Sequence, residues 1–427
     1  MDSSDTTDEP KKTYDQKTFF KIVGSFAVAE TLVWAAYYYS FAAFFPTWEA
    51  ELKFSKPVLT GAFTIALIVA AFAAPLVGRL IDFGHGKSLF SGGALVAGVL
   101  LLLLSQVTEV WQFYLIWFGI GLAMSSSLYE ACFAIITYTM GLEARRAITY
   151  VTLIAGFAST ISFPSAHILI KFFDWRIALI IFGVIIVTVA VPLIIYGSNQ
   201  AAYYAREKRQ SPSPTARKAM LVAKTWTFWL IAVTFTLAAC AHGMITTHML
   251  PILIGRGFTA EMAVLGASMI GPMQVAGRVI MTIFERHVSV LAICLVSFLS
   301  IFIAGLALYY SNAIPFAIAV FVIGQGAGYG VFSIIRPTII AQLLGRQNFG
   351  IIAGFLAIGF MLGSAVSPTI ASLLWEASDY GLVILVAAFL PIVCLITLTF
   401  AWRYRVKSSD NESVSYTHLT LPTKRIV

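Results

Sequence analysis

The sequence predicts an all-α integral membrane protein whose twelve transmembrane helices form two pseudo-symmetric bundles of six. Of its 427 residues, 59% are hydrophobic and 11% are charged, and the mean hydropathy is +0.86. A soluble domain is about half apolar and about one quarter charged, so no soluble core could bury this much apolar surface. Apolar segments of membrane length recur along the chain, and one long hydrophilic segment separates the first six from the last six.

The individual spans follow from their length, because a membrane-crossing helix needs about 20 mainly apolar residues. The hydrophilic segment contains a Ser-Pro-Ser-Pro run among basic residues, which is typical of a linker. The rule predicts helices at 19–46, 57–80, 88–107, 111–137, 147–171, 176–196, 225–250, 260–282, 288–310, 313–338, 349–373 and 380–402. The predicted domains are a tail (1–18), a bundle (19–196), a linker (197–224), a second bundle (225–403) and a tail (404–427).

The charge distribution predicts the orientation of the chain. Its net charge is +8, and membrane proteins collect Lys and Arg in cytoplasmic loops, so this charge does not indicate a nucleic-acid partner. If both termini lie in the cytoplasm, the cytoplasmic segments carry 19 Lys and Arg and the outer loops carry five. The asymmetry predicts cytoplasmic termini and a cytoplasmic linker.

The two halves of the chain share a local pattern of glycine and proline. A Gly-x-Gly triplet in the fourth predicted span of each half is followed by a proline in the fifth. The residues are Gly119, Gly121 and Pro164 in the first half and Gly324, Gly326 and Pro368 in the second. The pattern indicates two copies of one six-helix unit.

The connection between the second and third spans reads GRLIDFGHGK and begins at Gly78. Glycine permits the turn, Asp82 can face the positive end of a neighbouring helix, and Arg79 and Lys87 favour the cytoplasmic side. The hairpin resembles the loop signature G-x-L-x-D-[RK]-x-G-[RK]-[RK] of the major facilitator superfamily, with Phe83 at a usually basic position. The resemblance implies the major facilitator fold, alternating access, conformational roles for these hairpin residues, and a substrate site near the midplane between the bundles.

A second resemblance narrows the expected substrate. The start of the fifth span resembles the R-R-x-L-A-x-G-x-A-x-A-G signature of monocarboxylate transporters, and it matches at Arg145, Arg146 and the final Ala-Gly. In the eighth span Gln274 and Arg278 lie one turn apart, where the family carries an Asp–Arg pair whose arginine binds substrate carboxylate. The resemblance implies a monomeric secondary transporter of a small organic anion, a monocarboxylate, with proton symport or anion exchange. It is nearest to bacterial members, which implies the cytoplasmic (inner) membrane.

Ionisable groups inside a bilayer are expensive and are functional candidates by default. Glu30 lies about ten residues into the first span, roughly 15 Å deep, where a carboxyl group could load and unload a proton or form a structural hydrogen bond. Arg278 could bind a carboxylate through its planar fork, or it could repeat Arg79 as a packing and topology residue at the cytoplasmic end. Both pairs of alternatives remain open from the sequence.

The other polar and aromatic candidates also have competing interpretations. Glu130 and Arg336 occupy nearly equivalent places in the two repeats and could form a cytoplasmic gate, or each could reach the membrane interface separately. His242 and His248 in the seventh span could titrate near physiological pH or be hydrogen-bonded wall residues. The aromatic run 37–45, which includes Tyr38, could line a substrate cavity or form an interfacial belt.

Other classes of function lack sequence support. The four cysteines are isolated in apolar runs without metal-ligand spacing, and no catalytic triad, metal cluster, cofactor motif or phosphate-binding loop is recognisable. We therefore expect no enzyme activity, metal or cofactor. The main alternative is a proton-coupled exporter of drugs or other metabolites, with Glu30 coupling protons and Arg278 structural. A transport-inactive sensor would need a larger soluble domain. We expect no cleaved signal peptide, and residues 415–427 resemble translated sequencing adapter.

Overall fold

The computed structural model describes residues 15–204, 222–284, 287–345 and 349–404, except for the side chains of residues 82, 142, 145, 203, 204 and 349–351. Within these ranges there is no strand, and twelve helices are long and apolar enough to cross a membrane. The all-α class and all twelve predicted spans are therefore confirmed. The second tail, from residue 405, and most of the predicted linker lie outside the described residues.

The first bundle contains six spans, several of which are divided into shorter helices. They are α1 (Gln16–Val33), a π-helical segment (Trp34–Tyr39) and α2 (Ser40–Leu52); α3 (Lys56–Leu80); α4 (Gly86–Leu104); α5 (Val110–Ser127) and α6 (Tyr129–Met140); α7 (Ala144–Ala155) and α8 (Ala158–Phe172); and α9 (Trp175–Ile185), a π-helical segment (Ile186–Ala190) and α10 (Val191–Tyr204).

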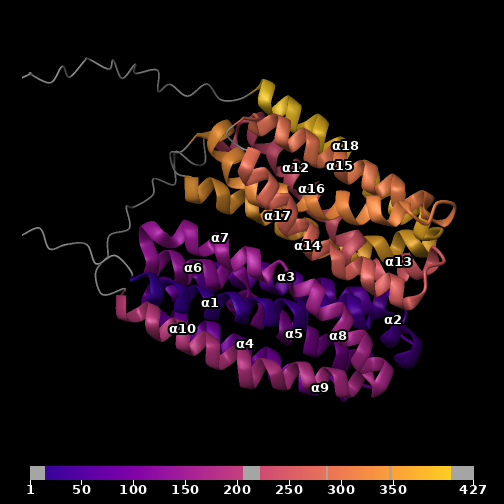
Figure 1. Cartoon of the computed structure of the whole chain (residues 1–427), viewed down its shortest axis with the longest axis horizontal. Helices are drawn as coiled ribbons and strands as arrows, with labels where there is room; N and C mark the ends of the chain where they lie inside the picture. The colour runs from indigo at the N-terminus through magenta and orange to yellow at the C-terminus, as the bar shows by residue number, and fades with distance from the viewer. Residues whose placement is uncertain (1–14, 205–221, 285–286, 346–348, 405–427) are drawn as a thin grey trace, which may run out of the picture.

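The second bundle contains six longer and mostly unbroken spans. They are α12 (Trp226–Thr247) with α13 (Met249–Gly255), α14 (Ala260–Phe284), α15 (Val290–Tyr309), α16 (Ala317–Leu344), α17 (Phe349–Ala377) and α18 (Tyr380–Arg403). The two bundles lie side by side with their helices running in similar directions (Figure 1). We call the end where α10 finishes and α12 starts the linker end, and the end that carries the α2–α3 and α13–α14 connections the distal end.

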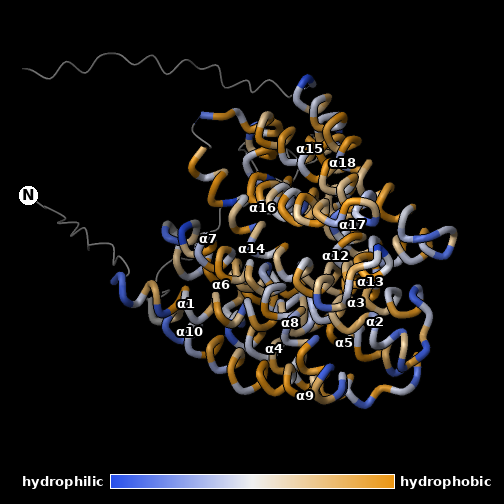
Figure 2. The backbone as a smooth tube through the Cα atoms, turned by 45° about the vertical axis from the view of Figure 1, so that its right-hand side comes forward, coloured by the Kyte–Doolittle hydropathy of each residue, from blue (hydrophilic) through white to orange (hydrophobic). Residues whose placement is uncertain are grey.

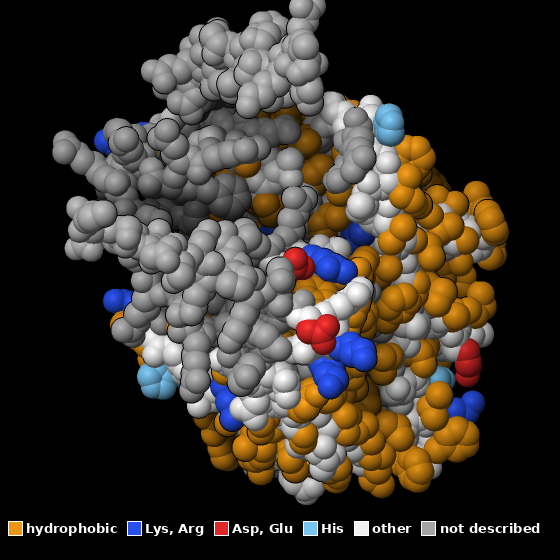
Figure 3. Space-filling model, turned by 60° about the vertical axis from the view of Figure 1, so that its left-hand side comes forward, with side chains coloured by type: hydrophobic (Ala, Val, Ile, Leu, Met, Phe, Trp, Pro, Cys, Tyr) orange, Lys and Arg blue, Asp and Glu red, His pale blue; other side chains and the backbone are white. Residues whose placement is uncertain are grey.

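The outer flanks of both bundles are apolar, as a lipid environment requires. The middle of most helices is hydrophobic and the polar residues concentrate at the helix ends (Figure 2). Viewed with the linker end turned forward, charged side chains gather on that face and hydrophobic side chains cover the flank beside it (Figure 3). Large apolar side chains such as Phe72, Leu115 and Val296 are exposed on the flanks.

Matching glycine contacts support the internal repeat. In the first bundle, a Cβ added to Gly121 on α5 would collide with the backbone of Ala66 on α3. In the second, a Cβ on Gly326 of α16 would lie 2.5 Å from the Cβ of Met273 and 2.9 Å from the carbonyl of Ile270 on α14. Small residues allow such close helix approach in membranes. The Gly-x-Gly triplets therefore perform the same packing role in both halves.

Several spans of the first bundle are interrupted near their middle. Leu128 is extended (φ −105°, ψ −172°) and separates α5 from α6, while Gly156 and Phe157 separate α7 from α8. The first span contains its π-helical segment at a similar depth. Irregular backbone at membrane depth occurs where protein or a water-filled cavity surrounds it, and π-helical turns often mark functional sites. The interruptions therefore point to the centre of the molecule.

Candidate functional site

The two bundles are joined at the distal end by hydroxyl pairs between α3 and α17. The Thr60 and Ser372 hydroxyl oxygens are 2.8 Å apart, and those of Thr64 and Thr369 are also 2.8 Å apart. Lys56 forms a salt bridge with Glu49. These contacts close the distal end in this conformation.

Lys56 and His248 make further contacts at the distal end. The Lys56 ammonium on α3 lies 4.0 Å from the ring centroid of Trp375 on α17. His248 contacts both the Ser372 hydroxyl (3.3 Å) and the Pro368 carbonyl (3.1 Å) through Nε2. Its ring also packs edge-on against Phe45 of the first bundle at 5.1 Å. His248 is therefore a hydrogen-bonded wall residue here, as one of the two interpretations expected.

Glu30 is completely buried on α1, fourteen residues or roughly 21 Å from the start of that helix. The helix begins earlier than predicted, so Glu30 is deeper than the sequence suggested. Both carboxyl oxygens and the neighbouring Trp34 Nε1 lack a hydrogen-bond partner in the described structure. Cys132 and Trp34 are near the carboxyl group but outside hydrogen-bond geometry. Among the described residues no hydrogen bond of ordinary geometry holds Glu30 in this conformation, and its role in proton coupling stays a prediction.

An aromatic wall in the first bundle lies beside Glu30. Trp34 begins the π-helical segment, and its ring centroid lies 4.7 Å from that of Tyr38 and 4.8 Å from that of Tyr129 on α6. Tyr39 is 5.3 Å from Tyr38, and Phe133 stacks on Tyr129 at 4.9 Å. All five residues are half-buried. We call this set the aromatic wall.

The remaining aromatic residues of the 37–45 run are buried inside the protein. The Tyr37 phenol oxygen lies 2.6 Å from the Ser127 hydroxyl oxygen, and the Phe41 ring stacks on the Phe63 ring with centroids 4.3 Å apart. Two small cavities between the bundles are bordered by Tyr39 and by Thr246 of α12. Of the two interpretations of this run, the interfacial belt does not fit, because the run faces the other helices and the bundle interface.

The second bundle presents a polar and aromatic cluster to this region. The His242 ring stacks on Tyr329 with centroids 3.4 Å apart and planes 5° apart, and its Nδ1 lies 3.2 Å from the Gln325 amide nitrogen. The phenol of Tyr329 is close enough to those of Tyr38 and Tyr39 for electrostatic interaction across the interface. The predicted site residues His242 and Tyr38 are thus brought into the same central region.

Arg278 links the two bundles on the linker side of this cluster. It is 9% exposed, and its guanidinium group donates to the Gly330 carbonyl (3.3 Å), the Ser333 hydroxyl (3.2 Å) and, in the first bundle, the Thr152 carbonyl (3.0 Å). Within the described residues no carboxylate lies within ion-pair distance of it. Arg278 is eighteen residues into α14.

Of the two interpretations left open for Arg278, the one that makes it a repeat of Arg79 does not fit its position. Arg79 lies twenty-three residues into α3, almost at its end, and is exposed. Arg278 is deeper in its span, is buried and faces the other bundle. It therefore does not serve as a repeat of the hairpin arginine. Gln274, one turn earlier on α14, is also buried, and its backbone packs against Gly330.

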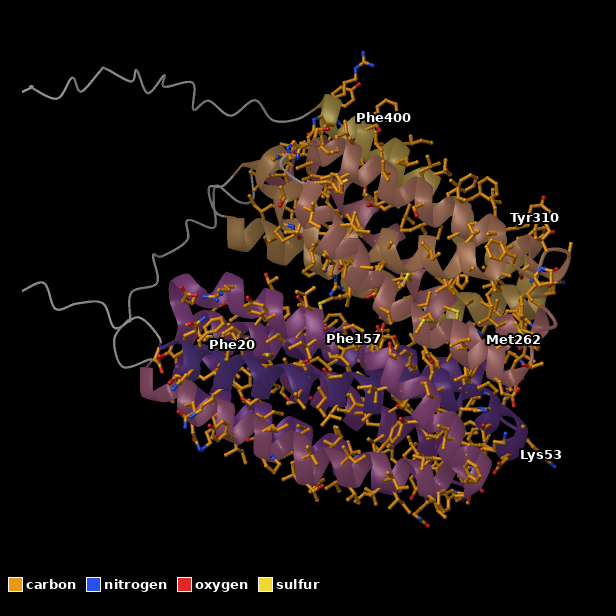
Figure 4. The ribbon with its side chains drawn as sticks, in the orientation of Figure 1. Phe20, Lys53, Phe157, Met262, Tyr310 and Phe400 are labelled. Carbon is orange, nitrogen blue, oxygen red and sulfur yellow. The ribbon has the colours of Figure 1, made fainter. Side chains whose placement is uncertain are left out.

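Glu130 and Arg336 are near one another but do not form an ion pair in this conformation. Their charges interact electrostatically, while the Arg336 guanidinium lies 3.8 Å from the Phe360 ring centroid. Glu130 is exposed and also interacts with Glu30. Because Glu130 faces Arg336 of the other bundle, its exposure indicates that solvent enters between the bundles from the linker end. The exposed Phe157 also lies between the bundles (Figure 4).

The hairpin has the backbone that its glycines suggested. Gly84 has φ 92°, a conformation that favours glycine, and Gly86 packs against Ile135 of α6. Arg79 and Lys87 are exposed, whereas the side chain of Asp82 lies outside the described residues. The hairpin connects α3 to α4 at the linker end.

The arginine pair of the fifth span is only partly described, because the side chain of Arg145 is not included. Arg146 lies 3.6 Å from the Glu143 carboxylate. Its guanidinium carbon is 4.9 Å from the Phe19 ring centroid and 5.8 Å from that of Tyr150. It therefore connects α7 to the start of α1.

Sequence reasoning missed three residues of the central region. Gln325 was noticed only as part of the Gly-x-Gly repeat, and Tyr329 and Ser333 were not singled out. All three lie on α16 at intervals of four residues, which places them on one helix face. A polar stripe at this spacing was the available signal. Four buried cysteines are free, and no cluster of three potential metal ligands occurs in the described residues.

Comparisons with known proteins identify relatives of this architecture. The family profile described as Major Facilitator Superfamily matches residues 26–324, more than half of the chain. The nucleoside transporter NupG is similar in fold, with a TM-score of 0.68 and 12% identity over 91% of this chain and 100% of that chain. A mutant of NupG is similar with a TM-score of 0.72 and 12% identity over 90% of this chain and 100% of that chain.

A bacterial homologue of the human lysosomal transporter Spinster, solved in an inward-facing and occupied conformation, is also similar. Its TM-score is 0.70, with 13% identity over 93% of this chain and 100% of that chain. At such identities the likeness concerns the fold alone. No curated protein matches the sequence.

Proposed function

Because the chain belongs to the Major Facilitator Superfamily, we propose that it carries a small organic anion, a monocarboxylate, across the bacterial cytoplasmic membrane by alternating access. The linker end would face the cytoplasm and the distal end the exterior. Transport would be coupled to protons or to a counter-anion, and the monomer would be the working unit. Asp82 and the other hairpin residues, together with Arg145 and Arg146, would stabilise particular conformations.

Arg278 is the observation that carries this proposal. A buried charge without an opposite charge is costly at membrane depth, and no carboxylate of the described residues pairs with Arg278. Its guanidinium fork suits a carboxylate, and its place between the bundles suits a ligand that must be released to either side. Gln274 would assist it from one turn away.

Glu30 is the proposed proton carrier. Its buried carboxyl group has no hydrogen-bond partner among the described residues, so its two protonation states are not fixed by a structural partner. Glu130, which is exposed and interacts with it electrostatically, would provide the route from the linker end. Glu130 and Arg336 would approach each other when that end closes.

Transport by purified protein in proteoliposomes tests the proposal. We expect uptake of labelled carboxylates, with accumulation when a pH gradient is imposed if protons are coupled. Charge-assisted hydrogen bonds contribute about 1.5–3 kcal/mol each, so removal of two should weaken binding roughly 10²- to 10⁴-fold. Arg278→Gln should show this weakening, and Arg278→Lys a smaller one because the charge remains without the fork.

Arg256→Gln is the matched control. Arg256 is also hydrogen-bonded to a backbone carbonyl, that of Tyr309 at 3.0 Å, but it lies at the distal end. Carboxylate transport should survive this change. Wild-type carboxylate transport in Arg278→Gln would refute the anion-site assignment.

The second candidate is a proton-coupled exporter of drugs or other metabolites. The aromatic wall favours it, because aromatic surfaces accept varied apolar ligands. In that case Glu30→Gln would abolish export while Arg278→Gln would alter only stability. The same panel of variants therefore separates the two functions.

A further inference from the structure

We propose that the transported carboxylate carries a planar aromatic ring, which is held between the aromatic wall and the half-buried ring of Tyr329. The inference rests on the proposed carboxylate function and extends it to the body of the substrate. It combines the stacked His242–Tyr329 pair, the half-buried aromatic wall and the unpaired Arg278.

The Tyr329 ring is held in one orientation by its neighbours. His242 covers one of its faces at a centroid distance of 3.4 Å with planes only 5° apart, and Gln325 holds the imidazole from the side at 3.2 Å. His242 and Gln325 are both buried, whereas Tyr329 is half-buried. The ring is thus fixed in direction while part of it remains accessible. A fixed aromatic face loses little conformational freedom when a ligand stacks on it.

Aromatic residues of the first bundle lie near the Tyr329 ring. Tyr38 and Tyr39 lie across the bundle interface, close enough for electrostatic interaction with Tyr329. Within the aromatic wall, Tyr38 packs against Trp34, and Trp34 packs against Tyr129. The wall belongs to spans one and four, and Tyr329 to span ten. Both sides of a flat ligand would therefore meet aromatic surface.

The Arg278 guanidinium group lies about one helical turn from the Tyr329 ring. Arg278 donates to Ser333, which is four residues from Tyr329 on α16 and on the same helix face. One turn corresponds to roughly 6 Å along the axis. Arg278 also interacts electrostatically with Tyr39 and Tyr129 of the wall. A ring attached directly to a carboxylate at Arg278 would therefore reach the Tyr329 face.

Aliphatic substrates do not account for this arrangement as well. A short carboxylate would use Arg278 but would leave the aromatic surfaces around it unmatched. A saturated ring has similar volume and apolar area, but it lacks the flat face and the quadrupole that favour aromatic pairing. Comparing an aromatic ring with its saturated counterpart therefore isolates the proposed contact from simple burial.

The experiment measures binding of three labelled probes, benzoate, cyclohexanecarboxylate and lactate, to the purified full-length protein in lipid nanodiscs. We expect benzoate to bind roughly tenfold more tightly than cyclohexanecarboxylate, and lactate more weakly than both. Tyr329→Leu and Trp34→Leu should each reduce the preference for benzoate towards unity. Tyr329→Phe, which keeps the ring, should retain it.

Trp229→Leu is the control, because Trp229 is a large aromatic residue of α12 that is 57% exposed away from the site. The preference should persist in this variant. Equal binding of benzoate and cyclohexanecarboxylate by the unmodified protein would overturn the aromatic subsite while leaving the carboxylate function intact. A preference that persists in both leucine variants would also overturn it. If none of the three probes binds, the proposed function and the subsite fail together.

Discussion

Weakening the hydroxyl contacts between α3 and α17 should shift the protein towards a conformation that is open at the distal end. The perturbation is the double variant Thr369→Val and Ser372→Ala, which removes the two 2.8 Å hydroxyl pairs with Thr64 and Thr60. Both changes keep the side chains close to their original size. Thr60 retains its bond to the Lys56 carbonyl at 2.9 Å, so its hydroxyl group keeps one partner.

The expected magnitude follows from the two hydrogen bonds between the bundles that the double variant removes. Ser372→Ala also removes the 3.3 Å contact with His248, which lies within the second bundle. A hydrogen bond between neutral groups contributes about 0.5–1.5 kcal/mol net. Removing two would shift the equilibrium between the conformations by about 1–3 kcal/mol, which corresponds to about 5- to 150-fold. His248 retains its bond to the Pro368 carbonyl, so the distal contact should weaken without being abolished.

The assay is the labelling rate of Ala42→Cys by a membrane-impermeant maleimide. Ala42 borders a cavity between the bundles and is 5% exposed, and the four native cysteines are buried. Lys53→Cys in the exposed α2–α3 connection calibrates access (Figure 4). It should react in intact cells if the distal end is external, and reaction only after permeabilisation would reverse the proposed orientation.

A matched control distinguishes a gate from a general weakening of packing. Thr234 and Thr397 form a comparable hydroxyl pair at 2.7 Å, but both belong to the second bundle. Thr234→Val should leave the labelling rate of Ala42→Cys unchanged. The reasoning is refuted if the double variant labels no faster than the parent, or if Thr234→Val accelerates labelling equally.

Two other predictions concern coupling and packing. Glu30→Gln should abolish accumulation driven by a pH gradient while sparing exchange, because the amide cannot carry a proton. Glu376→Gln, a change at an exposed carboxylate, is the control. If Glu30→Gln still accumulates substrate in proteoliposomes under a pH gradient, Glu30 is not the proton carrier. Gly330→Ala should lower the free energy of unfolding by about 1–3 kcal/mol, because the added Cβ would lie 2.6 Å from the Gln274 Cα. Thermal unfolding in detergent should therefore show a lower midpoint for this variant. Gly24→Ala, whose Cβ would have no atom within 4 Å, should keep the parent midpoint, and equal midpoints for the two variants would contradict the predicted collision.

The fold was predictable because hydropathy records the membrane environment directly. Each apolar segment of sufficient length forms a helix, and the glycine triplets mark equivalent helix contacts. The interruptions at Leu128 and in the π-helical segment Trp34–Tyr39 were not predicted. Neither contains proline or glycine. Their backbone is set by contacts with other helices, and such tertiary effects override local propensity.

The candidate site was predictable only where a residue was chemically conspicuous. Glu30 and Arg278 are charged residues in apolar spans, so they could be named from the sequence. Thr60 and Ser372 could not, because hydroxyl side chains are common in membrane helices and usually bond to their own backbone. Whether such a hydroxyl reaches the other bundle depends on how the helices are arranged. Tyr329 could not be distinguished in the sequence from the many other aromatic residues in the spans.

The contacts within the bundles differ in kind from those between them. Inside each bundle, glycines such as Gly121 and Gly330 let helix backbones touch, and close-packed contacts of this kind resist deformation. Between the bundles, the distal contact consists of hydroxyl pairs, the Lys56–Trp375 contact and the edge-on packing of His248 on Phe45. The linker-side contact includes the Arg278–carbonyl bond. A Cβ on Gly271 of α14 would collide with the Gly156 carbonyl at the break in the fifth span. The bundles therefore also approach closely near mid-span, with side-chain contacts on either side. Stiff bundles that touch at this central point can rock against each other at small energetic cost, which is the motion that alternating access requires.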